Sequence, residues 1–114
     1  DVCSSDLVHL HIPSEHCFGN TFLKKEGKVV GVDEENPLSR NGGKSVVIQK
    51  YIRPHVSGKI ISIGDGISDA ETFLQGYSDE FWGFFLHVSR PALAKKATKS
   101  FFSSEDFLRA VKDC

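Results

Sequence analysis

The chain has 114 residues, of which 39% are hydrophobic and 25% charged, and its formal net charge is −1. This composition is typical of a globular protein with one modest core. It excludes the strongly basic surface that nucleic acids and anionic membranes attract, and no apolar run approaches the about 18 residues of a membrane span. We therefore expect neither a nucleic-acid nor a membrane partner.

The first forty residues carry weak structural signals. Residues 1–7 resemble a peptide translated from a sequencing adapter, so we expect them to be non-native and assign residues 8–114 to part of one domain. The elements predicted here are the tail of a helix at 8–13, the start of a short strand at Cys17-Phe18, a β-hairpin of residues 21–25 and 28–32 about Glu26-Gly27, and a loop at 36–38.

The rest of the chain alternates between helices and strands. The predicted elements are a helix at 44–52, a strand at 59–63, a helix at 69–75, a strand at 81–86, a helix within 91–97, a strand at 99–102 and a last helix from 103. Pro54 ends the first helix, because the residue before a proline avoids the helical region. Gly76 suits a helix C-terminus, and Ser89 and Ser103 suit helix caps. Strands that alternate with helices predict an α/β fold with a parallel sheet.

Three apolar segments are predicted to form the core. Ile60 to Ile63 is typical of a buried strand, and Phe107, Leu108 and Val111 should face inward from the last helix. Continuous apolar runs are also typical of strands buried on both faces. We therefore assign a further aromatic group to the core rather than to a base-stacking platform: Phe81, Trp82, Phe84, Phe85, Phe101 and Phe102.

The strand at 59–63 runs into an acidic turn, Gly64-Asp65-Gly66-Ile67-Ser68-Asp69. Open α/β sheets bind ligands outside the carboxyl ends of their strands. Mg²⁺ takes oxygen ligands there and often also holds substrate phosphate. Asp65 and Asp69 therefore predict a metal-assisted phosphate site. The alternative is a plain turn, in which Asp and Gly are common; the spacing fits neither an EF-hand nor a P-loop.

A second polar turn, Ser39 to Lys44, precedes the helix at 44–52. Lys44 stands at the N-terminus of that helix, where a cation is unfavourable to the helix dipole. Neutralising a bound phosphate is one task that explains such a charge. The alternative is an ordinary solvated lysine, the usual fate of this residue type.

Taken together, Gly42-Gly43-Lys44, a helix and then Gly64-Asp65-Gly66-Ile67-Ser68-Asp69 resemble the third and fourth motifs of the haloacid dehalogenase superfamily, most closely its phosphoserine phosphatase-like branch. The resemblance covers about residues 10 to 112 and includes the hairpin about Glu26-Gly27. It implies a Rossmann-like core with a parallel sheet and a small hairpin.

The resemblance also implies roles for individual residues. Lys44, with Gly43 beside it, is expected to contact the phosphoryl group of the substrate. Asp65 is expected to ligate Mg²⁺, and Asp69 to support the metal and the catalytic centre. The implied activity is phosphomonoester hydrolysis through an aspartyl-phosphate, with phosphoserine or a similar small phosphorylated metabolite as the substrate. Such chemistry depends on positioning and charge neutralisation.

The chain departs from the family pattern because it contains no D-x-D motif. The nucleophile strand and the cap domain that the family pattern would add are therefore not found in this sequence. Ser4 and Ser5 receive no catalytic role, since too few residues separate them from Leu10 for a helix of ordinary length. We expect the 114 residues alone to be inactive. The alternative function is a non-catalytic relative that serves as a binding or regulatory module.

Cysteines and histidines complete the candidate groups. Cys3, Cys17 and Cys114 form no C-x-x-C pair, which indicates a reducing compartment and a cytoplasmic protein. A second group contains metal-ligand types, but its spacing fits no standard zinc pattern, and surface histidines are the preferred interpretation: His9, His11, His16 and Cys17. The sequence does not indicate an oligomeric state.

Overall fold

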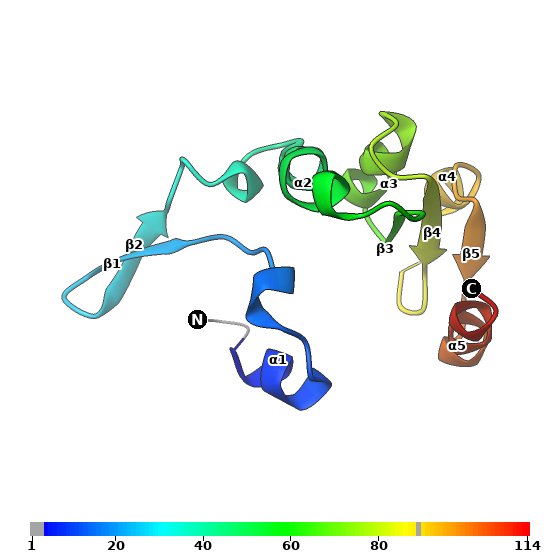
Figure 1. The fold of residues 1–114 in the computed structure, drawn as a ribbon, viewed down its shortest axis with the longest axis horizontal. Coiled ribbons are helices and arrows are strands. Elements are labelled where there is room, and N and C mark those ends of the chain that lie inside the picture. Colours follow the sequence, from blue (N-terminus) through cyan, green and yellow to red (C-terminus); the bar gives the residue numbers. More distant parts are fainter. Residues whose placement is uncertain (1–3, 89) are drawn as a thin grey trace. The chain divides into compact units, whose positions relative to one another are not determined.

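The structure is a computed structural model that describes residues 4–88 and 90–114. It divides into two compact units, Asp1–Arg40 and Asn41–Cys114 (Figure 1). The division falls inside the single domain predicted from residue 8, and the non-native origin of residues 1–7 stays a prediction. The candidate site residues all belong to the second unit.

The first unit contains a short helix and a β-hairpin. Its elements are α1 (Ser4–Leu10), the 3₁₀ turn η1 (Ser14–His16), β1 (Phe22–Lys25), β2 (Lys28–Val32) and the 3₁₀ turn η2 (Pro37–Ser39). The antiparallel pairing of β1 with β2 confirms the predicted hairpin. Glu26 and Gly27 both have positive φ, 52° and 75°, as a tight two-residue turn requires.

Two predictions for this unit are wrong. The helix predicted at 8–13 lies earlier, over Ser4–Leu10, and His11 ends it with a φ of 54°. Residues 4–10 form a helix of seven residues, and no helix of ordinary length separates Ser5 from Leu10. Cys17 and Phe18 form no strand in the described chain. A strand needs a hydrogen-bonded partner, and β1 and β2 pair with each other.

The second unit is a mixed α/β arrangement. Its elements are α2 (Gly43–Val47), the π-helical turn η3 (Ile48–Ile52), the 3₁₀ turn η4 (Arg53–His55), β3 (Ile61–Gly64), α3 (Ile67–Leu74), β4 (Glu80–Phe84), α4 (Pro91–Ala94), β5 (Lys99–Phe101) and α5 (Ser104–Lys112). The three strands form one parallel sheet in the order β3-β4-β5, which confirms the predicted fold class (Figure 1).

The central strand β4 is covered on both faces, and its side chains alternate between the two. Phe81, fully buried, packs with Ala70 of α3 and Leu93 of α4 on one face. Trp82, 2% exposed, meets the rings of Phe101 and Phe107 on the other. The helices α3 and α4 therefore cover one face, and α5 covers the opposite one.

The beginnings of β3 and β4 are joined by Asp79. Its carboxylate accepts hydrogen bonds from the Ile60 N–H at 2.8 Å and from Arg53 at 3.1 Å. These two bonds, the Ile60 one foremost, lower the pKa of Asp79. The next residue, Glu80, also has a lowered pKa, because it accepts hydrogen bonds first from Lys59 and then from the Trp82 indole.

Most of the predicted elements of this unit are present, with shifted ends. The helix predicted at 44–52 changes to a π-helical turn at Ile48 and to a 3₁₀ turn at Arg53. The helix predicted at 69–75 begins earlier, at Ile67, and Gly76 follows it with a φ of 84°. Ser103 caps α5 as predicted, its Oγ accepting from the Asp106 N–H. The predicted cap Ser89 lies outside the described residues.

Four core predictions are wrong. The side chains of Ile63, Phe102, Leu108 and Val111 are all substantially exposed, between 45% and 63%. Ile63 is exposed because β3 lies at an edge of the three-stranded sheet. In α5 it is Phe107 that contacts the aromatic side chains of the sheet, whereas Leu108 and Val111 are exposed.

Candidate functional site

The acidic turn joins the carboxyl end of β3 to the start of α3. Gly64 is the last residue of the strand, Asp65 and Gly66 form the connection, and the helix begins at Ile67. The side chain of Asp65 is exposed at this edge of the sheet, whereas Asp69, in the first turn of α3, is half-buried. The turn thus presents one carboxylate to solvent and holds the other against the protein.

Asp69 is held through both of its side-chain oxygens. Its Oδ1 lies 2.5 Å from the Nζ of Lys44, and its Oδ2 accepts a hydrogen bond from the Gly66 N–H at 3.3 Å. The Asp69 N–H in turn donates to the Gly66 carbonyl at 3.2 Å. This reciprocal pair satisfies amides at the start of α3, as a capping side chain does, and it explains why the helix begins before the predicted residue.

Gly64 is required by the position of the Asp69 side chain. A Cβ built on Gly64 would lie 2.0 Å from Asp69 Oδ2 and 2.3 Å from its Cγ, closer than real Cβ atoms approach. The absence of a side chain at Gly64 therefore lets the carboxylate cross the end of β3. Gly66 is less constrained, because its Cβ would meet Asp69 Oδ2 at an ordinary 3.5 Å.

Lys44 lies in the first turn of α2, which begins one residue before the predicted start, at Gly43. Gly42 precedes the helix with a φ of 79°, and the next residue, Gly43, is buried. The side chain of Lys44 is 51% exposed, against 14% for the Asp69 side chain. The Lys44 ammonium group therefore pairs with a carboxylate that is held in place, while about half of the lysine side chain is accessible to a ligand.

A second contact between α2 and α3 lies beside this ion pair. The hydroxyl of Ser45, which is buried, donates to the side-chain oxygen of Gln75 at 3.0 Å. Ser45 directly follows Lys44, and Gln75 ends α3. The two helices are thus linked near Lys44 by one ionic and one neutral hydrogen bond, which fixes the approach of the lysine to Asp69.

The donor set of the turn suits a hard divalent cation. Asp65 and Asp69 offer only oxygen ligands, and Mg²⁺ in proteins keeps several waters and binds through one or two carboxylates together with substrate phosphate. Over residues 4–88 and 90–114, no three His, Cys, Asp or Glu side chains converge on a position that could hold a metal ion. Two carboxylates from this chain therefore fit a Mg²⁺ site that is completed by water and ligand.

The structure brings Lys44, Gly43 and Asp69 into one small region of the fold, with Asp65 at the adjoining strand end. The assignment of these four residues to substrate and metal stays a prediction. Sequence reasoning missed the direct pairing of Lys44 with Asp69, because a contact between residues 25 positions apart depends on how two helices pack. It also missed the contact of the Ser62 hydroxyl with the Asp69 carbonyl oxygen. A serine between two isoleucines of a strand was the signal that could have indicated it.

Comparisons with known proteins show a similarity to phosphoserine phosphatases. The chain is 32% identical over 103 residues to the chloroplastic phosphoserine phosphatase of Arabidopsis thaliana, a match that covers 90% of this chain and 35% of the relative. It is 35% identical over 89 residues to human phosphoserine phosphatase, covering 77% and 39%. The chain thus spans little more than a third of the length of these curated relatives. No family model matches it.

The fold is also that of a known structure. A phosphoserine phosphohydrolase-like protein from Francisella tularensis superposes with a TM-score of 0.81, at 19% sequence identity, over 96% of this chain and 50% of that protein. None of the helices in the described part of this chain has the length and hydropathy that crossing a bilayer requires. Sequence and fold agree: over 90% of its length the chain is similar to part of a phosphoserine phosphatase, and it has the fold of a phosphoserine phosphohydrolase-like protein.

Proposed function

We propose that the protein containing this chain is a Mg²⁺-dependent phosphomonoesterase whose substrate is phosphoserine or a similar small phosphorylated metabolite. The observation that carries this proposal is the Lys44–Asp69 ion pair at the carboxyl end of β3, where the same acidic turn also exposes Asp65. The printed names of the relatives support the substrate class.

In this proposal Lys44 binds and neutralises the phosphoryl group. Phosphoryl transfer needs positioning and charge neutralisation more than covalent chemistry from the protein. Asp69 orients the ammonium group from one side, and the exposed half of the lysine side chain leaves room for phosphate oxygens on the other. Gly43, immediately before Lys44, is a further substrate contact, because a glycine lets a ligand approach the main chain.

Asp65 and Asp69 would hold the Mg²⁺ ion in the same proposal. When bound, the ion neutralises charge on the phosphoryl oxygens. The nucleophile is an aspartate of a D-x-D motif, which these 114 residues do not contain. Its carboxylate would attack phosphorus and break the ester bond, so that the serine hydroxyl leaves after taking up a proton; water would then hydrolyse the aspartyl-phosphate to inorganic phosphate and the free carboxylate, and one difficult step becomes two easier ones.

The test is phosphate release by the purified full-length protein. With phosphoserine and Mg²⁺ we expect release, its loss on adding EDTA, and its return when Mg²⁺ is restored. A panel of other small phosphomonoesters measures the preference for phosphoserine. A folded full-length protein that releases no phosphate from any of these substrates would contradict the proposal and favour a non-catalytic binding module.

A further inference from the structure

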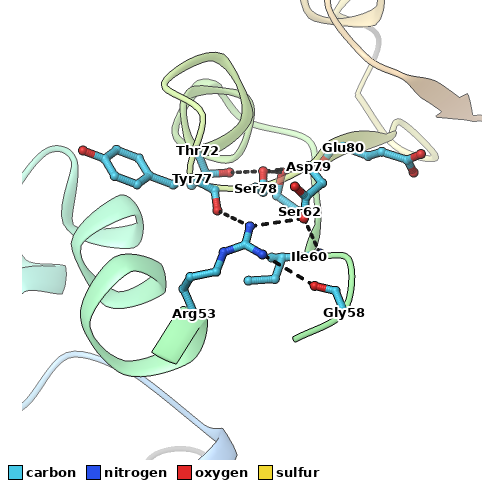
Figure 2. A network of polar contacts seen from close by, with 9 residues as sticks. All are labelled: Arg53, Gly58, Ile60, Ser62, Thr72, Tyr77, Ser78, Asp79 and Glu80. Atoms are coloured by element: carbon cyan, nitrogen blue, oxygen red, sulfur yellow. Dashed lines mark hydrogen bonds and ion pairs between the residues drawn. The ribbon is translucent and has the colours of Figure 1, made fainter. Parts of the chain in front are cut away.

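Three hydroxyl side chains gather where β3, α3 and the start of β4 meet. Thr72 belongs to α3, Ser62 to β3, and Ser78 to the loop before β4 (Figure 2). Thr72 and Ser78 are buried, with 1% and 3% of their surfaces exposed. We refer to Ser62, Thr72 and Ser78 as the hydroxyl network.

Two of these hydroxyls hydrogen-bond to the main chain of Asp69. Thr72 Oγ1 donates to the Asp69 carbonyl oxygen at 2.7 Å, and Ser62 Oγ lies 3.1 Å from the same atom and 3.2 Å from the Glu80 carbonyl oxygen, so its one proton serves either carbonyl. A carbonyl oxygen has two lone pairs and can accept both. The side chain of this residue contacts Lys44 and the Gly66 N–H. Hydrogen bonds that hold the Asp69 carbonyl group therefore also restrict the position of the Asp69 carboxylate.

Ser78 connects the other two hydroxyls to β4. Its Oγ lies 3.3 Å from Thr72 Oγ1, 3.1 Å from Ser62 Oγ and 3.3 Å from the Glu80 carbonyl oxygen. Each hydroxyl supplies one proton and can accept others, so the three satisfy one another and the two carbonyls. No buried side-chain nitrogen or oxygen of the described chain lacks a partner. Removing one hydroxyl therefore takes one donor and one acceptor out of this buried network.

Arg53 links the loop of Ser78 to the helical segment that begins near Lys44. Its guanidinium donates to the Tyr77 carbonyl at 3.2 Å and to the Asp79 carboxylate at 3.1 Å (Figure 2). Arg53 directly follows the π-helical turn that continues α2. The loop before β4 is thus tied both to the segment that carries the lysine and, through its hydroxyl, to the segment that carries the aspartate.

We propose that the hydroxyl network positions Asp69: it holds the first turn of α3 so that the carboxylate stays on Lys44 and at the metal-binding end of β3. None of the three hydroxyls touches the reacting groups, so they are positioning residues. The effect of the network on catalysis rests on the proposed function. Its stabilisation of the first turn of α3 is a property of the fold and can be measured without an activity assay.

The decisive variants separate the Thr72 hydroxyl from the volume it fills. Thr72→Val keeps the shape and removes the donor, and Thr72→Ser keeps the donor. In the full-length protein we expect Thr72→Val to lower kcat for phosphoserine about 10- to 100-fold with little change in KM, the usual loss when a supporting hydrogen bond is removed. Thr72→Ser should restore most of kcat. The control is Ser103→Ala, which removes the α5 cap, so that stability falls while kcat is unchanged.

Amide hydrogen exchange supplies a readout that does not need turnover. In the same full-length protein, we expect the Gly66 and Asp69 amides to exchange at least about tenfold faster in Thr72→Val than in wild type, as local opening predicts. They should be unchanged in Ser103→Ala. Ser78→Ala provides the same comparison should Thr72→Val not fold.

The two measurements keep the inferences distinguishable. If the wild type hydrolyses no phosphomonoester, the proposed function fails and the exchange result alone decides the positioning role. Equal exchange at Gly66 and Asp69 in Thr72→Val and Ser103→Ala overturns the positioning role. A Thr72→Val variant that keeps the wild-type kcat while Thr72→Ser loses it also overturns the positioning role, because the methyl group rather than the hydroxyl would then matter.

Discussion

At the scale of single residues, the account depends most on Lys44. Replacing it with alanine in the full-length protein should lower kcat/KM for phosphoserine about 100-fold or more, as removing one charge-stabilising group does. Lys44→Arg should recover little of this loss, because a planar guanidinium does not replace a compact ammonium group. The measurement is steady-state phosphate release.

Lys96→Ala is the matched control for this prediction, since Lys96 is an exposed lysine after α4. It should keep the parental kcat/KM. If Lys44→Ala keeps it as well, Lys44 is only a surface residue and its resemblance to the family's motif lysine is accidental.

Gly64 gives a second prediction at this scale, on stability. Gly64→Ala should lower the free energy of unfolding by about 1–3 kcal/mol, the typical cost of inserting a group where there is no space, because the new Cβ would overlap the Asp69 carboxylate. Gly66→Ala should cost less, since its φ of −114° suits alanine and its Cβ has room. Urea unfolding of both full-length variants compares them. Equal losses would contradict the steric argument.

At the scale of elements, the sequence correctly predicted those strands and helix caps that depend on local residue patterns. The apolar runs around Ile61, Phe81 and Phe101 predicted all three strands of the parallel sheet, and Ser103 predicted the start of α5. These signals are local because each strand or cap is set by a few adjacent residues. The same patterns also predicted the parallel sheet, since helices separate its strands.

What the sequence could not predict depends on tertiary contacts. An apolar stripe on a helix does not distinguish α- from π-helical hydrogen bonding, so the turn at Ile48–Ile52 was not foreseen. The prediction that Ile63 is buried was wrong, because the apolar sequence of a strand does not show whether the strand lies at the centre or at an edge of the sheet. The partner of Lys44 was missed because Asp69 reaches it only through helix packing.

The junction between β3 and β4 makes stability depend on pH. Because the Ile60 N–H and Arg53 lower the pKa of Asp79 in the folded state, its ionised form stabilises the fold. That contribution is fully present above the ordinary pKa of 3.8 and is lost as the pH falls from there through the folded-state value. The stability difference between wild type and Asp79→Asn should therefore be largest near neutral pH and shrink below about pH 4.

Urea unfolding of the two full-length proteins at a series of pH values measures this difference. Glu80, whose pKa is also lowered, is present in both proteins and cancels in the comparison. A difference that stays constant between neutral pH and pH 3 would show that the Asp79 contacts do not favour its ionised form.

At the scale of the whole molecule, we expect the 114 residues alone to be inactive and marginally stable. They contain no D-x-D motif. Ile63 of β3 and Ile67 of α3 are 45% and 61% exposed, and β3 lies at a sheet edge. An exposed apolar edge favours aggregation. Light scattering, a thermal melt and a phosphate assay of the isolated chain test this; a cooperative monomeric melt contradicts the instability, and Mg²⁺-dependent turnover contradicts the inactivity.

The most direct test of the central claim is the activity of Asp65→Asn in the full-length protein. Asp65 stands exposed at the carboxyl end of β3, so the substitution removes one negative charge without disturbing the core. We expect phosphoserine hydrolysis at saturating Mg²⁺ to fall about 100-fold or more, comparable with the loss of a key electrostatic group, while the thermal midpoint stays that of the wild type. Near-normal turnover by this variant would contradict the assignment of the acidic turn as the metal site.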